Sequence, residues 1–424
     1  MSTKIKIINI MSHPPAYTLV TDEPRPTLNW DTPNGRWVGI WGLDWHDLLG
    51  NEVLRTSDMF EYEVWQPDFR ADRIYEHRFE NGLAHKLFPA KKRAFLDGLK
   101  ISHDLFSRDI LQMLESAADK SGPLVLHLDA SPALMSEAIV SKFHNNIPMV
   151  HQFYGDFRRY FVHERRKYFL KGAHTYLKTR WQRRYFSKLR NVLTCRIEGL
   201  DLLEKNLKAK IYTISWGIDF DFWSKDKSKE VARRLLNIPQ DKFVMLSSSR
   251  LYPAKQIDKW IRTLGHISSG DFHYYVTGHG TEGYEKELQN LRKEMKLEDR
   301  VFFVGFVDVD VLKNYYLASD IFVTTSVSEM GPHSAELAMA MELPVMATDT
   351  GMVGLILKDT DCGVLLPIHD YDIWKSKIED AINGQKIRPV PLEVTRQIFD
   401  GAKAIQEYKN IYMDAVIQVN GAGR

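Results

Sequence analysis

Residues 243–276 read FVMLSSSRLYPAKQIDKWIRTLGHISSGDFHYYV, and this stretch decides the fold. Phe243–Ser247 is a short, mainly apolar run, which is typical of a buried strand. Gln256–Ile267 spaces its apolar residues three and four apart, which predicts an amphipathic helix. Phe272–Val276 is strand-like again. A strand, a helix and a second strand in close succession predict a βαβ unit within a parallel sheet.

The same alternation extends in both directions along the chain. Toward the C-terminus it predicts strands at Val301–Val304, Ile321–Thr325 and Val345–Ala347, and helices at Tyr284–Met295, Val311–Ala318 and Ser334–Met341. Toward the N-terminus it predicts strands at Lys4–Ile10, Tyr62–Gln66, Leu124–Leu128 and Ile147–Phe153, and helices at Asp44–Leu54, Phe95–Ala118 and Pro132–Phe143. Each half of the chain is therefore expected to form a parallel sheet with helices on both faces.

The predicted fold class is α/β, with two Rossmann-like doubly wound domains facing a central cleft. A chain of 424 residues is too long for one ordinary core. The polar stretch Asp219–Lys227 separates the two alternating patterns, so we place the domains at 1–218 and 219–398. Ligands of such sheets bind at the carboxyl ends of the strands.

The composition is that of a folded globular protein, with 44% hydrophobic residues, 26% charged residues and a net charge of +2. The overall charge therefore points to no partner. The two cysteines, Cys195 and Cys362, form no CxxC pair, which favours a reducing compartment. Lys4–Ile10 is too short for a signal sequence, and no apolar run reaches the roughly 18 residues of a membrane span. We expect a cytoplasmic protein.

Residues 158–190 are strongly basic, with twelve lysines and arginines, one acid (Glu164) and interleaved aromatics. One interpretation is a pair of core-facing helices with basic outer faces. The other is a surface for anionic lipid headgroups, peripheral on the inner face of a membrane, or for a phosphate-bearing acceptor. No nucleic-acid-binding motif accompanies the stretch, so we expect no nucleic-acid partner.

The loop after the strand at 243–247 carries two cations, Arg250 and Lys255, five residues apart. Arginine offers a planar fork and lysine a point charge, and together they suit one diphosphate. Alone, such residues are usually solvated surface charges.

Six motifs in order give these cations a context. They are Ile214–Asp219, Arg250 with Lys255, Gly278-His-Gly280, Asp299–Val307, Ala318–Glu329 and Leu343–Gly351. With these motifs the chain resembles the family-four retaining glycosyltransferases (glycosyl transferases group 1) of the GT-B fold, from about residue 190 to 412.

The resemblance implies a donor site for a UDP-, GDP- or ADP-linked sugar, and no cofactor beyond that substrate. It implies that Arg250 and Lys255 stabilise the leaving diphosphate and that Glu329 orients the sugar, without a protein nucleophile. It also implies transfer to a glycan, lipid-linked or small-molecule acceptor with retention of configuration. The C-terminal segment 399–424, amphipathic over Phe399–Val416, is then expected to return to the first domain.

Further donor-binding residues follow from the same resemblance. They are Gly278 in a tight turn, Phe306 and Val307 at the base, and Gly331, His333 and Ser334 at a helix N-terminus facing the diphosphate.

The chain departs from the family at its second glutamate. The family has two glutamates eight apart, and a gapless match to Glu329 places Leu337 at the second position. Glu336 comes one residue early. We favour a loop shorter by one residue that restores Glu336 to the ribose, because a ribose needs an acceptor for its hydroxyls. Alternatively, Glu336 is a first-turn glutamate favoured by the helix dipole.

Acceptor-side candidates follow the strands of the first domain. Tyr154 matches the position of a histidine that the family often has near the reacting sugar, and Asp156 follows it. His127 and Asp129 come from the strand at 124–128 and its end, and His13 and Gly42 lie in the first loops.

We expect no metal, although Asp308-Val-Asp310 has the Asp-x-Asp spacing of metal-dependent glycosyltransferases. Asp308 directly precedes a predicted helix and is better interpreted as its N-cap. A nucleotide-sugar epimerase, or a catalytically inactive GT-B subunit that binds an active partner, remain the alternatives.

Overall fold

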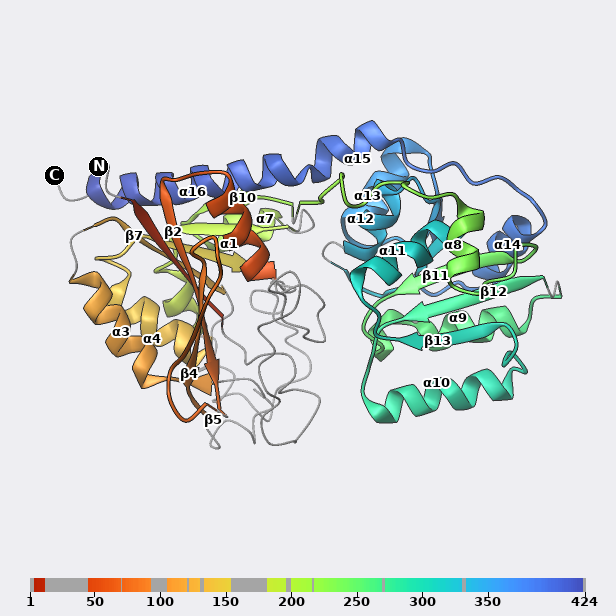
Figure 1. The fold of residues 1–424 in the computed structure, drawn as a ribbon, viewed down its shortest axis with the longest axis horizontal. Coiled ribbons are helices and arrows are strands. Elements are labelled where there is room, and N and C mark those ends of the chain that lie inside the picture. The colour runs from red at the N-terminus through yellow and green to blue at the C-terminus, as the bar shows by residue number, and fades with distance from the viewer. Residues whose placement is uncertain are drawn as a thin grey trace. The chain divides into compact units, whose positions relative to one another are not determined.

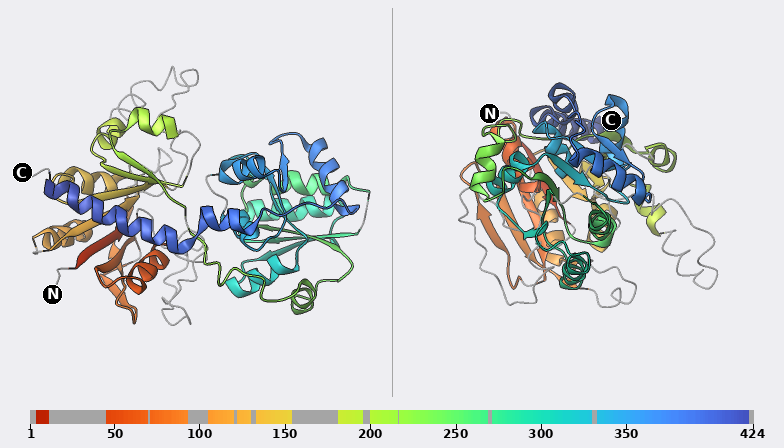
Figure 2. Two further views of the ribbon diagram at one scale, coloured as in Figure 1. Left: turned by 90° about the horizontal axis from the view of Figure 1, so that it is seen from above. Right: turned by 90° about the vertical axis from the view of Figure 1, so that its right-hand side faces the viewer.

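The computed structural model describes residues 4–11, 45–69, 71–92, 105–119, 122–129, 133–153, 181–195, 200–215, 217–268, 271–329 and 333–421. The chain divides into two compact units, shown in Figures 1 and 2. Unit 1 comprises Met1–Cys195, Gly199–Ile214 and Ile405–Arg424, and unit 2 comprises Arg196–Glu198 and Ser215–Ala404. The chain thus passes into unit 2 at Ser215 and leaves it after Ala404, where the sequence analysis placed the changes at 219 and 399.

Unit 1 is built around an eight-stranded sheet. Its elements are β1 (Ile5–Ile10), α1 (Trp45–Arg55), β2 (Phe60–Asp68), β3 (Tyr75–Arg78), β4 (Ala84–Pro89), β5 (Lys91–Lys92), β6 (Leu105–Phe106), α3 (Arg108–Ala118), β7 (Leu124–Asp129), α4 (Leu134–Phe143), β8 (Met149–Phe153), β9 (Asn191–Thr194), α7 (Leu200–Asn206), β10 (Lys210–Thr213) and α16 (Gly401–Gly421), most of which lies here.

The strand order in this sheet is β10-β9-β8-β7-β1-β2-β4-β3. Every pairing is parallel except that of β3 with β4 at the edge. The register pairs Ile7 with Tyr62 on one side and with Val125 on the other. β1 and β7 are neighbours although far apart in sequence, so the order reverses there and marks the switch point of the sheet.

Helices cover both faces of this sheet, as a doubly wound fold requires. Alternate residues of β1 point to opposite faces, and Ile8 and Ile10 pack with buried side chains of α3, α4 and α7. Ile7 packs on the other face with α1 and α16. Figure 1 shows α16 running along unit 1, away from α3 and α4. The predicted return of the C-terminal segment to the first unit is therefore observed.

α16 binds the sheet through both apolar and polar contacts. Tyr408, Ile411, Tyr412 and Ala415 follow a three- and four-residue spacing, and all are buried. Within the interior, the Tyr408 hydroxyl donates to Gln152 Oε1 at 3.1 Å. The Tyr412 hydroxyl lies 2.9 Å from His127 Nδ1. These hydrogen bonds satisfy buried polar groups and fix the position of the helix on the sheet.

Unit 2 holds a six-stranded sheet with the order β13-β12-β11-β14-β15-β16, and every pairing in it is parallel. Its elements are α8 (Lys229–Leu235), β11 (Phe243–Ser248), the 3₁₀ turn η2 (Pro253–Lys255), α9 (Ile257–Gly265), β12 (Phe272–Thr277), α10 (Glu282–Glu294), β13 (Val301–Gly305), α11 (Val309–Ala318), β14 (Ile321–Thr324), α12 (His333–Ala340), β15 (Val345–Thr348), α13 (Gly351–Thr360), β16 (Val364–Leu366), α14 (Tyr371–Ile382) and α15 (Leu392–Phe399).

Two separate cores lie on the two faces of the unit 2 sheet. Val244 and Leu246 of β11 pack with buried residues of α8, α11, α12 and α13. Met245 faces the opposite side, where α9, α10 and α14 contribute Trp260, Trp374 and other large side chains. The predicted βαβ alternation is confirmed in this unit.

One prediction for unit 1 is wrong, and two strands were missed. Residues 105–106, expected within a long helix from 95 to 118, form strand β6, which pairs with β5. The helix starts only at Arg108, because the Ser107 side chain accepts a hydrogen bond from the Ile110 N–H and caps it. Residues 93–104 lie outside the described residues. Strands β3 and β4 were not anticipated. Five of the six residues of β4 are buried, so this strand lacks the alternation of buried and exposed residues that marks a half-buried strand.

Two buried histidines make the stability of unit 1 sensitive to acid. Burial lowers the pKa of His127 to about 4 and that of His151 to about 3. Below about pH 6.5 the unfolded chain takes up protons that the folded chain excludes. Each histidine therefore lowers the free energy of unfolding by about 1.4 kcal/mol for every unit by which the pH falls. This loss continues until the pH reaches the folded-state pKa.

When the pH falls from about 6.5 to 5, we predict that the wild type loses about 2 kcal/mol more of its free energy of unfolding than His127→Gln does. Urea-dependent hydrogen exchange in α16 peptides measures this for unit 1. The matched control is His266→Gln, at an exposed position of unit 2. An unchanged pH dependence in His127→Gln would show that this histidine does not stay neutral under α16.

Candidate functional site

The switch point of the unit 2 sheet lies between β11 and β14. These strands are adjacent, with Met245 paired to Ile321 and Leu246 to Phe322. The Ser247 hydroxyl donates to the Val323 carbonyl at 2.6 Å and accepts from the Tyr274 hydroxyl at 2.8 Å. The loops that follow β11 and β14 therefore leave the same edge of the sheet side by side. In open α/β sheets this is where ligands bind.

The loop after β11 presents Lys255 at the end of a single turn. Pro253 begins η2, where its fixed φ suits the first helical position. Gln256 then adopts φ 51°, in the left-handed region, and α9 begins at the next residue. This sharp change of direction ends η2 directly after Lys255. A left-handed residue other than glycine is strained, and such residues cluster at functional sites.

Lys255 forms an ion pair with Glu329 from the loop after β14. Their side chains are only 14% and 12% exposed. Glu329 Oε1 accepts from Lys255 Nζ and also from the Ser326 hydroxyl. The predicted diphosphate cation and the predicted sugar-orienting carboxylate are thus in direct contact.

Backbone bonds hold the same two loops together. The Thr325 hydroxyl donates to the Lys255 carbonyl at 2.9 Å, and the Val327 N–H donates to the Ala254 carbonyl at 2.9 Å. The Thr348 hydroxyl at the end of β15 donates to the Ser326 carbonyl at 2.6 Å. The position of the ion pair is therefore fixed by the backbone and not only by the two charges.

Arg250 adds a second cation to this edge. Its guanidinium lies 5.2 Å from the ring centre of Tyr252, and Lys255 Nζ lies 5.7 Å from the same ring. Arg250 is exposed, yet neighbouring atoms partly desolvate it and lower its pKa, while Tyr252 and Glu329 act in the opposite direction. A guanidinium stays protonated in proteins despite such a shift. Arg250, Lys255 and Glu329 thus form one cluster.

Gly278 brings the end of β12 against the loop after β11. Gly278 has φ 115°, and a Cβ at this position would lie 2.0 Å from the Ser249 carbonyl oxygen. The Leu251 N–H donates to the His279 carbonyl at 2.7 Å, next to this contact. Only glycine permits this approach. Gly278 therefore shapes the loop that carries Arg250.

His279 and Glu285 were not anticipated, although both organise this edge. The Phe306 N–H donates to His279 Nε2 at 3.2 Å, which leaves the proton on Nδ1, 3.5 Å from Glu285 Oε1. Glu285 also accepts from the Gly280 N–H at 2.6 Å. The Phe306 N–H is therefore already used. If Phe306 and Val307 contact a base, as expected, they do so through other backbone groups. A histidine between two glycines was the available signal.

At the start of α12, His333 and Glu336 are partners. His333 Nδ1 lies 3.2 Å from Glu336 Oε2, and Glu336 is only 2% exposed. Leu337, the gapless match to the family's second glutamate, is buried in the core instead. The carbonyl of Ser334 accepts from the Tyr316 hydroxyl at 2.8 Å. Gly331 lies outside the described residues.

The acceptor-side candidates are only partly described. Tyr154, Asp156, His13 and Gly42 lie outside the described residues, and Asp129 is the last residue of β7. His127 does not support an acceptor contact. It is fully buried under α16 and hydrogen-bonded to Tyr412.

Asp308 occupies the N-cap position of α11, as predicted, but its side chain makes no capping hydrogen bond. Within the described ranges, no group of three or more histidines, cysteines, aspartates or glutamates is arranged to hold a metal ion. In the same part of the chain, no helix is long and apolar enough to cross a membrane.

Comparison with known proteins agrees with this geometry. Residues 228–394 match the family described as glycosyl transferases group 1. The matched residues make up most of unit 2, so this unit is similar to the glycosyl transferases group 1 family. The resemblance found in the sequence is confirmed.

Relatives in this family are similar over part of their length. The D-inositol 3-phosphate glycosyltransferase of Saccharomonospora viridis is 25% identical over 223 residues, which is 50% of this chain and 52% of that protein. The enzyme of the same name from Mycolicibacterium smegmatis is 26% identical over 178 residues, 42% of this chain and 41% of that protein. The chain thus spans about half the length of the curated relatives it matches.

Solved structures show the GT-B fold over nearly the whole chain. Sucrose-phosphate synthase from Thermosynechococcus elongatus has a TM-score of 0.69 and 17% identity, covering 96% of this chain and 98% of that one. Anabaena HepE in complex with UDP-glucose has a TM-score of 0.65 and 16% identity, covering 96% and 99%. The predicted fold class is confirmed.

We predict that Gly278→Ala disrupts this site more than its backbone strain alone explains. The positive φ costs about 1–2 kcal/mol, and the 2.0 Å approach to Ser249 adds a steric term. Urea unfolding measures the loss of stability, and binding of a nucleoside diphosphate measures the damage to the loop.

Two other glycines of unit 2 supply matched controls. Gly384→Ala isolates the positive φ, because φ is 96° and a Cβ there meets no atom within 4 Å. Gly283→Ala in α10 has neither feature. Equal effects of Gly278→Ala and Gly384→Ala would mean that contact with Ser249 does not shape the loop.

Proposed function

We propose that this chain transfers a sugar from a nucleotide-diphosphate-sugar donor to an acceptor hydroxyl, with retention of configuration and without a metal. The observation that carries the proposal is the ion pair of Lys255 with Glu329 beside Arg250, at the switch point of the group 1 domain. Two cations and one oriented carboxylate suit a diphosphate linked to a polyhydroxylated ring.

The hydrogen bonds of this cluster leave capacity for a substrate. The Lys255 ammonium has three donors, and one is directed to Glu329. Both side-chain hydrogen bonds to Glu329 reach Oε1. Oε2 can therefore accept from a hydroxyl of the donor sugar, while Lys255 and Arg250 contact the phosphates. Glu329 would in this way set the distance between the sugar and the cations.

In the proposed reaction, the bond between the anomeric carbon and the diphosphate oxygen breaks as the acceptor oxygen attacks the same face. The departing diphosphate oxygen takes the acceptor's proton, so no protein base or nucleophile is required. Arg250 and Lys255 stabilise the negative charge that develops on the leaving group. The products are the glycosylated acceptor and a nucleoside diphosphate.

The comparisons suggest which substrates to test first. HepE, a structural neighbour, has been solved with UDP and with UDP-glucose, so UDP-glucose is the first donor, followed by GDP- and ADP-linked sugars. The relatives are named for D-inositol 3-phosphate, which favours a phosphorylated hydroxyl compound as acceptor. Glycan and lipid-linked acceptors from glycolipid or polysaccharide biosynthesis are the next class.

We extend the proposal to peripheral contact of residues 158–190 with an anionic membrane. Within the described part of this stretch, Arg183, Arg184 and Arg190 are exposed. Tyr185 and Phe186 are buried in the core, so they are not available to insert between headgroups. The attraction would therefore be electrostatic and would weaken with salt.

We predict that Lys255→Ala lowers turnover at saturating donor by about 100-fold, the scale of losing one transition-state donor. The matched control is Lys259→Ala, which removes a partly exposed lysine four residues further on in α9. The assay follows release of nucleoside diphosphate and identifies the glycosylated product, and activity should persist in excess EDTA.

Wild-type turnover in Lys255→Ala would refute the diphosphate assignment. Loss of activity in EDTA, restored by manganese, would instead assign Asp308 and Asp310 to a metal. Conversion of the donor to an isomer without transfer would favour the epimerase alternative. Absence of turnover with every donor would favour the inactive subunit.

A further inference from the structure

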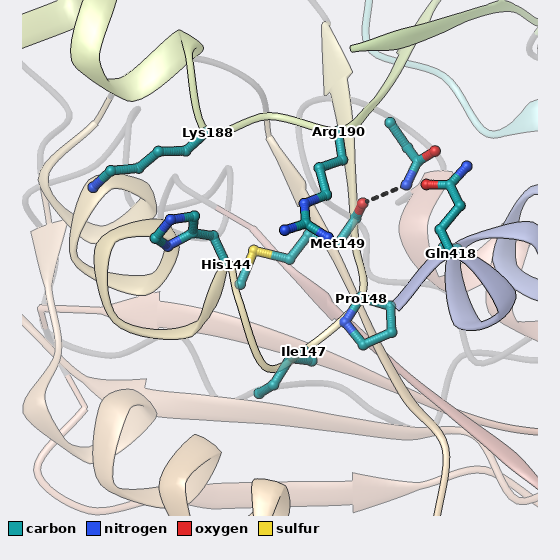
Figure 3. A pocket seen from close by; sticks show the side chains of 9 residues that line it. His144, Ile147, Pro148, Met149, Lys188, Arg190 and Gln418 are labelled. Atoms are coloured by element: carbon teal, nitrogen blue, oxygen red, sulfur yellow. Dashed lines mark hydrogen bonds between the residues drawn. The ribbon is translucent and has the colours of Figure 1, made fainter. Parts of the chain in front are cut away.

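A small basic pocket lies in unit 1 at the amino-terminal edge of its sheet. Met149 begins β8 and Asn191 begins β9, and both line the pocket. His144, which directly follows α4, and Lys188 and Arg190, which precede β9, also line it. Figure 3 shows the guanidinium of Arg190 next to Met149, on the side toward His144. Substrates of doubly wound sheets bind at the opposite edge, so this pocket is distinct from the proposed donor site.

The described residues that line this pocket include cations and no carboxylate. Lys188, Arg190 and His144 supply up to three positive charges. The Lys188 ammonium donates to the Ser141 hydroxyl at 2.6 Å, which in turn donates to Glu137 at 2.7 Å. Two other acids pair with cations outside the pocket. Asp414 of α16 pairs with Lys210 at 3.0 Å, and Glu115 pairs with Lys142. Burial lowers the pKa of His144, and the charges of Lys188 and Arg190 lower it further. An anion placed here would relieve this mutual repulsion.

Two buried polar atoms of the pocket residues have no hydrogen-bond partner among the residues that the structure describes. Asn191 is 2% exposed, and its Nδ2 donates to the Met149 carbonyl at 3.2 Å. Its Oδ1 is buried and accepts nothing from the described residues, and His144 Nδ1 is buried without a partner as well. Buried polar groups are normally satisfied by protein, water or a ligand. The missing partner of Asn191 Oδ1 must be a donor.

A phosphate monoester has the chemistry that all these groups require. Its oxygens accept from the guanidinium of Arg190, from a protonated His144, and from the two Lys188 donors that the hydrogen bond to Ser141 leaves. Its protonated oxygen donates to Asn191 Oδ1. A phosphodiester or a carboxylate would supply the acceptors but no donor for the asparagine.

We propose that this pocket binds a phosphate group, either as hydrogen phosphate ion or as the phosphomonoester headgroup of a lipid. Ala415 and Gln418 of α16 line the same pocket as Lys188 and Arg190. A bound phosphate therefore connects the loop before β9 to the end of α16 and strengthens the docking of that helix. The role is separate from the sugar transfer proposed for unit 2.

Methyl NMR of the full chain with labelled methionines tests the proposal directly. Inorganic phosphate, added at constant ionic strength, should shift the methyl resonance of Met149 saturably. Met149→Leu assigns that resonance, and the remaining methionines of the fourteen report non-local effects. Arg190→Ala and Lys188→Ala should each weaken the response about tenfold or more, the scale of one hydrogen bond to a charged group.

Arg183→Ala with Arg184→Ala is the matched control, because it removes two exposed cations nearby that do not line the pocket. It should leave the response unchanged. Sedimentation with phosphatidylcholine vesicles that contain phosphatidic acid, or phosphatidylglycerol as the diester comparison, identifies the source of the phosphate.

A Met149 shift without vesicle binding supports the free ion. Binding to phosphatidic acid that depends on Arg190 and exceeds binding to phosphatidylglycerol supports the lipid headgroup. The proposal is overturned if neither probe binds, or if binding is the same in Arg190→Ala and Lys188→Ala as in the wild type.

Discussion

The ion pair between Lys255 and Glu329 is the interaction on which the site in unit 2 depends. Each residue lies on a different loop, and the loops follow two strands that the topology makes adjacent. With both side chains largely buried, either charge would be costly without the other. Hydrogen bonds from the Val327 N–H and the Thr325 hydroxyl to backbone carbonyls of the turn carrying Lys255 keep this geometry. The parallel sheet thus supplies two loop ends, and the pair makes them one site.

Close backbone packing is the second constraint at this edge. Gly278 lets the end of β12 approach the loop that carries Arg250, and the His279 side chain extends this contact to Phe306 after β13. The ends of β11, β12 and β13 are consequently joined to one another, and β14 joins them through Glu329. Preorganised positive charge of this kind stabilises a leaving diphosphate without reorganisation during the reaction.

Much of unit 2 was predictable from sequence, because its strands and helices alternate with clear periods and its motifs fall at loop positions. Arg250 and Lys255 were predicted from their loop position and Glu329 from the family resemblance, and the structure brings Lys255 and Glu329 into contact. The histidine pairings were not, since the contacts of His279 with Phe306 and of His127 with Tyr412 join residues that no local pattern connects. His127 shows the limit most clearly, because a polar residue in a buried strand has the same local pattern whether it faces a substrate or a helix 285 positions away.

A double-mutant cycle on nucleotide binding tests the central claim most directly. Calorimetry would first select the tightest ligand among UDP, GDP and ADP, none of which carries a sugar for Glu329 to contact. If Glu329 acts on the diphosphate only by positioning Lys255, Glu329→Gln weakens binding in the wild type but adds little in the Lys255→Ala background. The coupling energy should then lie in the range of about 0.5–3 kcal/mol expected for residues in contact. Additive losses, or a nucleotide affinity that neither substitution changes, would contradict the account.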